Sequence, residues 1–579
     1  MSEDSIQMNF VIWNLGIETE IFIIMIIILL PSVFRLAGSA KGDAADLVLY
    51  GGTIYTVDEK NPGAEAVAIK GDRVIDVGSN DRVKKWISKK TRLIDLEGGT
   101  VVPGLIDCHG HMEWYGRSRG GVGLYDTKSY DEVLRRVKAR LDTVKPGDWV
   151  FGGGWAETNW AEKKLLTHER LSRISPINPV WLIRADGHSA LANAKAMELA
   201  GIRKEIRDPD GGEIIRDSIS GEPTGIFVDQ AMSLVTKMFP ATSDDDRIRS
   251  ILKAADDAAS VGLTGIHDAG VSYEVIQIYK KLAEQRRLKP RIYAMLGGYD
   301  LFLDDYFKNP PMIGFADNHL TVRSIKIAID GAMGSYGALL LKDYSDRKSH
   351  SGKMMRDPAG ITSIAVDALR NGFQLNVHAI GDRGVRLALD ILEQALRDFP
   401  RRDHRFRIEH VQLIDLNDIP RFIQLSIIPS MQPTHATSDM YWTEDRVGKE
   451  RIQGNYAWRK ILNTGSIIAG GSDFPIESMN PLWSIYSAIT RQNHDSWPKE
   501  GWYPEERMSR EEALKSFTLW AAYAAFEDNI KGSITPGKLA DLVVFSKDIM
   551  KVPAKELLDT KALLTIVGGE IVFQDKSGF

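Results

Sequence analysis

Cysteine is almost absent from this chain of 579 residues. The single cysteine, Cys108, excludes an intrachain disulfide, so packing or a bound metal must stabilise the fold. The chain also lacks any Asn-x-Ser/Thr acceptor for glycosylation and any polybasic block. Its 73 basic and 78 acidic residues are spread along the whole length, so we expect no nucleic acid as a partner.

One long hydrophobic run stands near the amino terminus. Residues Ile21–Leu30 are uninterrupted apolar sequence, and Gly38–Ala40 offers a small-x-small cleavage site. Ten residues are short for a membrane-spanning helix, which needs about 20, but fit the apolar core of a signal peptide. We therefore expect residues 1–44 to be a targeting or anchor segment, with delivery to the secretory pathway or endoplasmic reticulum, or membrane association through residues 21–34. The protein is cytoplasmic if this segment is not a targeting segment.

The order of strand-like and helix-like segments predicts the organisation of the rest. The length suffices for one large domain and a smaller one. Residues 45–100 and 527–579 both contain short β-branched strands broken by glycine turns, so we expect them to pair into one composite β-sandwich domain. Residues 101–526 alternate apolar strands with helices, which predicts an α/β fold with a TIM-like (β/α)8 barrel. The stretch of about 112–261 is too long for an ordinary connection and predicts a large insertion that forms a lid or wall.

Two histidines follow the first apolar strand of this region. His109 and His111 are separated by one residue, so on a strand their imidazoles point to the same side. Neutral imidazole is a common ligand for zinc and related ions. A bare His-x-His is equally consistent with two unrelated polar residues at a strand end, so the rest of the chain must decide.

Further strands end in residues that can bind a metal. Apolar runs end in His378, in His410 and in Asp473. Each residue alone could simply cap a strand. In a parallel barrel, however, the carboxyl ends of all strands lie at the same rim, so the pattern predicts one shared site.

Separate phrases of the sequence resemble the metal-dependent amidohydrolase superfamily, and in particular its amidohydrolase family 3 branch. The resemblance runs from about residue 45 to 575. It rests on these segments: Gly104–His111, Arg184–Ala190, Gly221–Gly225, Asp330–Ser335, Met431–His435 and Gly471–Pro475.

The resemblance implies a catalytic centre with one or two divalent metal ions, with zinc the expected ion. It implies that Lys326 reacts with carbon dioxide to form a carbamate that bridges two metals; the alternative is a lysine paired near the barrel rim, for instance with Asp330. Asp473 would pass a proton from water to the leaving amine, and His410 would polarise the carbonyl if only one metal binds. The implied metal ligands are His109, His111, Lys326, His378, His410 and Asp473.

The implied reaction is hydrolysis of a carbon–nitrogen bond in a small-molecule amide, such as an N-acyl or N-formyl amine, rather than in a peptide. A deaminase or a cyclic-amide hydrolase could use the same centre, and a non-catalytic signalling protein could retain the fold. Substrate contacts are predicted for Trp155, Asp186, His188 and His435, although loop residues of these types also bind backbone groups. We also expect a homodimer as one mode of assembly.

Overall fold

The structure of the protein is a computed structural model that describes residues 44–164, 166–298 and 301–576. The apolar run Ile21–Leu30 and the predicted cleavage site lie outside the described residues. Within those ranges, each helix is too short or too polar to traverse a lipid bilayer. Targeting, membrane association and the homodimer therefore stay predictions.

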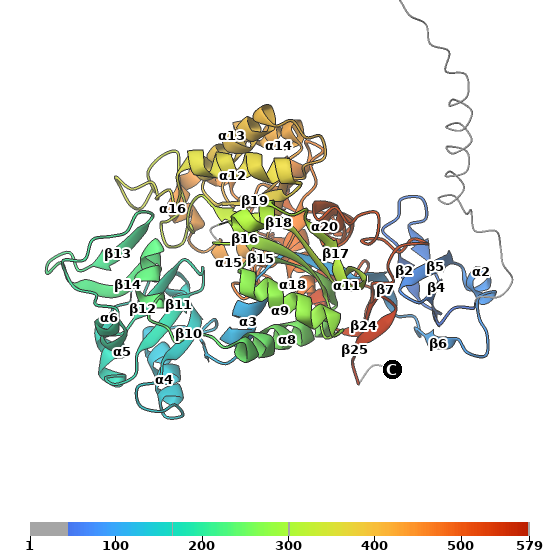
Figure 1. Cartoon of the computed structure of the whole chain (residues 1–579), viewed down its shortest axis with the longest axis horizontal. Coiled ribbons are helices and arrows are strands. Elements are labelled where there is room, and N and C mark those ends of the chain that lie inside the picture. The colour runs from blue at the N-terminus through green and yellow to red at the C-terminus, as the bar shows by residue number, and fades with distance from the viewer. Residues whose placement is uncertain (1–43, 165, 299–300, 577–579) are drawn as a thin grey trace, which may run out of the picture.

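Eight parallel strands form a nearly closed barrel at the centre of the molecule (Figure 1). Each strand pairs with the next, and a single parallel bridge between Gly110 and Phe474 links the two ends of the sheet. The predicted α/β fold with a TIM-like barrel is confirmed at this level. In chain order the barrel strands are β8 (Leu105–Gly110), β15 (Leu263–Val271), β16 (Arg291–Gly297), β18 (Leu320–Ala328), β19 (Gln374–Ala379), β20 (Arg407–His410), β21 (Ile428–Met431) and β22 (Ala469–Gly470).

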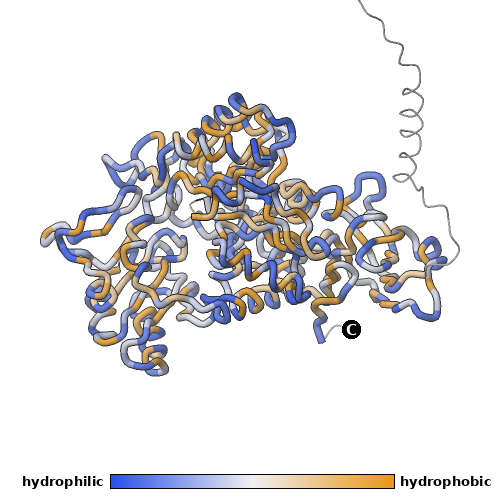
Figure 2. Tube along the Cα trace, in the orientation of Figure 1, coloured by the Kyte–Doolittle hydropathy of each residue, from blue (hydrophilic) through white to orange (hydrophobic). Residues whose placement is uncertain are grey.

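Helices cover the outside of the barrel and bury its apolar outer surface. Outward residues of the strands, such as Leu105 and Ile325, share one large hydrophobic cluster with helix residues such as Ile251 and Leu389. Figure 2 shows hydrophobic stretches running through this central region. The covering helices include α8 (Asp244–Ser260), α9 (Tyr273–Glu284), α12 (Pro358–Asn371), α13 (Asp382–Asp398), α14 (Ile419–Leu425), α18 (Pro481–Thr490), α19 (Arg510–Ser516) and α20 (Leu519–Ala524).

Local sequence sets where the longest helices begin and end. Ser243 precedes α8 and accepts a hydrogen bond from the Asp246 amide, which satisfies one of the free donors of the first turn. Gly372 ends α12 in the left-handed conformation, which glycine adopts without a steric penalty. Ser243 thus sets where α8 begins, and Gly372 turns the chain from the end of α12 toward β19.

Strands from both ends of the chain lie together beside the barrel, on the right of Figure 1. One sheet has the order β5-β4-β1-β6, and a second has the order β25-β24-β23-β7-β2-β3. A single hydrophobic cluster, which includes Leu49, Val67 and Val544, joins residues of both sheets. The strands are β1 (Leu47–Tyr50), β2 (Thr53–Tyr55), β3 (Gly63–Ala64), β4 (Ala66–Lys70), β5 (Arg73–Gly78), β6 (Arg92–Asp95), β7 (Thr100–Pro103), β23 (Leu542–Phe545), β24 (Ala562–Val567) and β25 (Glu570–Gln574).

The long connection between β8 and β15 contains a sheet of its own, on the left of Figure 1. This inserted subdomain has the strand order β13-β14-β12-β11-β10-β9 and is followed by α8, which leads into β15. Its strands are β9 (Val122–Gly123), β10 (Val150–Trp155), β11 (Val180–Arg184), β12 (Ser189–Ala192), β13 (Gly212–Arg216) and β14 (Pro223–Asp229), and its helices include α4 (Tyr130–Leu141), α5 (His168–Ile174) and α6 (Ala194–Leu199).

Candidate metal centre

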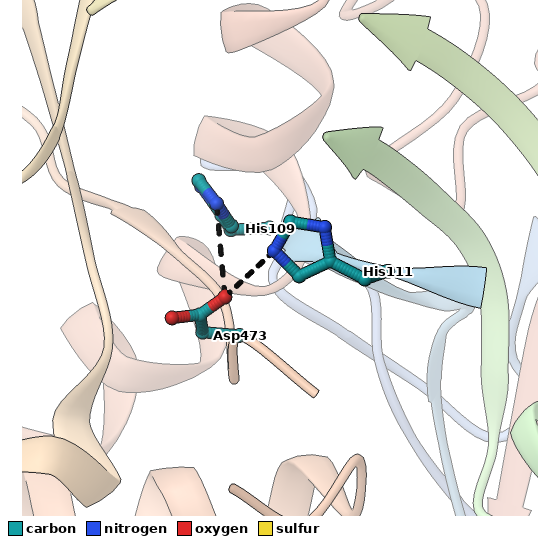
Figure 3. A group of neighbouring side chains, drawn as sticks. All are labelled: His109, His111 and Asp473. Atoms are coloured by element: carbon teal, nitrogen blue, oxygen red, sulfur yellow. Dashed lines mark hydrogen bonds and ion pairs between the residues drawn. The ribbon is translucent and has the colours of Figure 1, made fainter. Parts of the chain in front are cut away.

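The carboxyl ends of the barrel strands bring the predicted ligands together. β8 ends at Gly110, between His109 and His111, and Asp473 follows β22. Figure 3 shows the two imidazoles turned toward the Asp473 carboxylate. The other predicted ligands lie on neighbouring strands: Lys326 on β18, His378 on β19 and His410 at the end of β20.

His109, His111 and Asp473 form the first cluster of metal-competent atoms. The His111 Nε2 atom lies 3.1 Å from Asp473 Oδ1, and the His109 Nε2 atom lies 3.8 Å from the same oxygen. One ligand atom from each residue falls within 4.8 Å of the others. The Lys326 Nζ atom lies 2.9 Å from His109 Nε2, so the lysine approaches this cluster directly.

A second cluster contains His410, His435 and Asp473. His410 Nδ1 lies 4.0 Å and His435 Nε2 3.8 Å from Asp473 Oδ2. His378 lies beside this cluster, with its ring centroid 4.5 Å from that of His410. His435, predicted from the sequence only as a substrate contact, is therefore also positioned to serve as a metal ligand.

The donor set and the free ring nitrogens fit a divalent metal. The Nε2 atoms of His378 and His435 are buried and have no hydrogen-bond partner among the described residues. Buried polar atoms normally find a partner, and a metal would supply one here. His410 Nδ1 lies 2.9 Å from Gln432 Oε1, which can only accept, so the proton of the neutral ring is on Nδ1 and its Nε2 is free to bind a metal.

A buried carboxylate on the far side of His109 fixes the orientation of that ring. Glu409 Oε2 lies 2.5 Å from His109 Nδ1 and accepts a hydrogen bond of 2.9 Å from Arg407 Nη2. Arg407 also lies 3.0 Å from His267 Nδ1 and is completely buried. A carboxylate that accepts from one ring nitrogen leaves the other nitrogen as the ligand atom.

The sequence reasoning missed this Arg407–Glu409 pair. The only trace of this pair in the sequence is the glutamate directly before His410. Neighbouring side chains on a strand point to opposite faces, so this position would not be expected to face the same centre as His410. The backbone explains how both reach the centre, because His410 has a φ of 78°. Asp473 has a φ of 60°, and positive values of this kind in residues other than glycine store strain at functional sites.

Asp107 ties the first and last barrel strands together beneath the two clusters. Its carboxylate accepts hydrogen bonds from the backbone amides of His109 and Ser472, each 3.0 Å long, and one of 2.6 Å from the Ser472 hydroxyl. This bracing holds the backbone of His109 next to the loop that carries Asp473. Burial raises the pKa of Asp107 to about 7.

Burial also sets the protonation of the basic groups. It lowers the pKa of His109 to about 4, with the Lys326 charge adding to the effect, so this imidazole is neutral near pH 7. Burial lowers the pKa of Lys326 to about 8, which makes its neutral amine far more accessible than that of an ordinary lysine. Both shifts favour the unprotonated forms that bind metal or react with carbon dioxide.

A small cavity of about 90 Å³ opens beside the two clusters and includes three of the predicted substrate residues, Asp186, His188 and His435, in its lining. Trp155 does not line it. The Trp155 side chain is fully buried in the inserted subdomain, where its indole donates a 2.9 Å hydrogen bond to the Leu182 carbonyl. Trp155 is the last residue of β10, and its indole belongs to the hydrophobic core of the inserted subdomain rather than to the cavity wall.

Comparison with known proteins assigns the family. A profile of the amidohydrolase family matches residues 92–573. The chain belongs to the amidohydrolase family. This confirms the resemblance drawn from the motifs, and the histidine and aspartate clusters agree with the metal dependence of the family.

Relatives of this amidohydrolase extend over almost its full length. Protein LONG AFTER FAR-RED 3 of Arabidopsis thaliana is 34% identical over 577 residues, which cover 96% of this chain and 98% of that protein. N-substituted formamide deformylase of Arthrobacter pascens is 28% identical over 549 residues, which cover 91% and 98%. A solved structure of an uncharacterized metal-dependent hydrolase from Pyrococcus horikoshii is 25% identical with a TM-score of 0.71, covering 88% of this chain and 99% of that one.

Proposed function

We propose that this amidohydrolase cleaves a non-peptide carbon–nitrogen bond in an N-acyl or N-formyl amine. The observation that carries the proposal is the convergence of His109, His111 and Asp473 at the carboxyl ends of the barrel strands. The similarity to a formamide deformylase over 91% of the chain supports this type of bond.

The residues proposed to hold the metal follow from the two clusters. His109, His111 and Asp473 would bind one ion, and His378 and His410 would bind a second, with His435 close enough to contribute. Lys326, as a carbamate, would bridge them. A bound divalent ion, with zinc the first candidate, supplies a Lewis acid that acidifies water from a pKa of 15.7 to about 7.

Asp473 is the residue proposed to move the proton. Burial would raise the pKa of this carboxyl, but His111, His109 and His435 hold it well below its usual range, so the group is ionised at neutral pH. The carboxylate accepts a proton from water as the oxygen adds to the carbonyl carbon. It then delivers that proton to the nitrogen as the carbon–nitrogen bond breaks, and the products are a carboxylic acid and an amine.

His410 is proposed mainly as a metal ligand. Because its Nδ1 proton faces Gln432, its Nε2 atom offers a lone pair rather than a proton. This favours ligation over direct polarisation of the carbonyl by an imidazole proton, and it supports the two-metal form of the mechanism.

The proposal is tested by assaying zinc-loaded protein against N-formyl and N-acyl amines, with dipeptides, cyclic amides and amino-heterocycles as counter-substrates. We expect turnover of the first group and one to two equivalents of bound metal. Asp473→Asn should lower kcat by at least about 100-fold. Asp142→Asn, which changes an exposed carboxylate paired with Lys138, is the matched control and should leave kcat unchanged. Faster turnover of dipeptides than of simple amides would refute the proposed bond type.

A further inference from the structure

Two carboxylates line the cavity without a basic partner. Asp439 accepts a hydrogen bond from the Tyr456 hydroxyl, and Glu477 accepts one of 2.5 Å from the Ser438 hydroxyl. Throughout residues 44–164, 166–298 and 301–576, neither has a lysine, arginine or histidine nitrogen within 4.0 Å. Carboxylates enclosed by protein are normally paired with a cation.

The basic groups of the same wall are already paired. Arg184 donates from Nε to Glu157 at 2.9 Å and from Nη1 to Asp186 at 2.6 Å. His188 lies 2.7 Å from Asp229. Among the described residues, the wall therefore offers no unpaired arginine to a substrate carboxylate.

An aromatic groove continues from the cavity on the side of these carboxylates. The two spaces share Asn159, Ser438, Ile476 and Glu477, so Glu477 stands at the junction between them. The groove has a volume of about 500 Å³, and its one lysine or arginine, Arg119, lies 4.0 Å from Asp257. Its aromatic lining consists of Tyr115, Tyr125, Tyr441, Trp483 and His494.

The groove suits an extended cationic arm. Aromatic faces attract ammonium groups, and they also cover the methylene chain that carries such a group.

We propose that the substrate of this enzyme is a mono-N-acylated diamine whose protonated free amine is bound by Asp439 and Glu477. This inference rests on the proposed function and specifies its substrate class. The acyl group faces Asp473, the linking methylenes extend through the cavity toward the junction, and the ammonium is bound between Asp439 and Glu477, where the two carboxylates lack a basic partner. Water adds to the acyl carbon, the carbon–nitrogen bond breaks, and the released nitrogen takes the proton, so the products are a carboxylic acid and a diamine.

The test compares two substrates of equal shape on zinc-loaded full-length protein. N-formyl-1,4-diaminobutane carries a terminal ammonium, and N-formylpentylamine carries a methyl group in the same position. We expect kcat/KM to favour the cationic substrate by at least about tenfold, as one good charge-assisted contact provides. Glu477→Gln and the double variant Asp439→Asn/Glu477→Gln should bring the ratio to within about threefold of unity. Glu556→Gln, which removes a remote carboxylate paired with Lys547, should keep the full preference.

A binding measurement separates this inference from the proposed function. Calorimetric titration with 1,4-diaminobutane and with the uncharged pentan-1-ol needs no turnover, and the wild-type protein should bind the diamine at least about tenfold more tightly. Hydrolysis of both amides with a ratio near one, or a preference that persists in the double variant, would overturn the cation site alone. If neither amide is hydrolysed, the proposed function fails, while selective diamine binding that is lost in the double variant would still support the site.

Discussion

The carboxylate of Glu409 should control how tightly the centre binds metal. Its Oε2 atom contacts both His109 Nδ1 and Arg407 Nη2, and its Oε1 atom forms an ion pair with Arg407 Nε at 2.8 Å. Glu409→Gln keeps the shape but has a single oxygen. If that oxygen stays on His109, the neutral amide nitrogen takes the place of the oxygen that lies 2.8 Å from Arg407 Nε, and the buried guanidinium loses its ion-pair partner.

The expected magnitude has two parts. Removing a carboxylate that supports a ligating histidine typically weakens metal binding by about 10- to 100-fold, or roughly 1.4 to 2.8 kcal/mol. Leaving a buried charge unpaired typically costs about 3–5 kcal/mol of stability, and the retained Gln oxygen should keep the loss near the lower end. The pKa of Glu409 is consistent with this view: burial would raise it, but Arg407 and His109 hold it far below its usual range.

Zinc affinity is measured by competition with a fluorescent chelator, and stability by urea unfolding of the metal-free protein. Glu527→Gln is the matched control, because Glu527 forms a buried ion pair of 2.5 Å with Lys531 and contacts Thr321 near the opposite end of β18 from Lys326. We expect both variants to lose stability and only Glu409→Gln to lose zinc affinity. Equal zinc affinities in wild-type and Glu409→Gln protein would refute the reasoning.

Two further predictions concern the lysine of the centre and the junction between the barrel and the terminal sheets. Lys326→Ala should lower activity by more than about 100-fold, which exceeds the loss typical of a residue that only supports a metal ligand. Short carboxylates added to the assay should restore part of this activity. A variant with wild-type activity would contradict the carbamate. Asp541→Asn should destabilise the protein by about 3–5 kcal/mol at pH 7, because Asp541 binds Arg291 through contacts of 2.8 and 3.0 Å in a buried position. Burial alone would raise the Asp541 pKa, but Arg291 lowers it below its ordinary value, so this stability is present above about pH 4 and is lost as the pH falls through the folded-state pKa. Urea unfolding of both proteins between pH 3 and 7 should show the difference shrinking at the acid end, and a constant difference would exclude the ion pair as its cause.

The sequence was most informative where a residue's role depends on its position at a strand end. His109, His111, His378, His410 and Asp473 each follow or end an apolar run, and parallel strands place such residues at one rim of a barrel. The barrel itself follows from the same alternation of strands and helices. Each of these features depends on a short stretch of sequence, so the pattern of a single strand is sufficient to predict it.

Other parts depend on contacts that no local pattern reveals. Glu409 reaches the centre because the backbone of the next residue, His410, turns to a positive φ. Asp439 and Glu477 come from different segments and meet at one wall only in the folded chain. Trp155 was expected to contact the substrate, but it is the last residue of β10 and its indole is buried in the inserted subdomain. In each case tertiary packing, rather than residue type, decided the outcome.

The pairing of β7 with β23 has a consequence for synthesis on the ribosome. β7 ends at Pro103 and its partner begins at Leu542, so roughly 440 residues must be made between them. At about 5–20 residues per second, the first strand waits about 20 to 90 s for its neighbour. During that interval an apolar edge of the nascent chain is uncovered, which is a hazard for aggregation. The enzyme is therefore expected to depend on chaperones while it is being translated, and a fragment that ends before β23 should be poorly soluble.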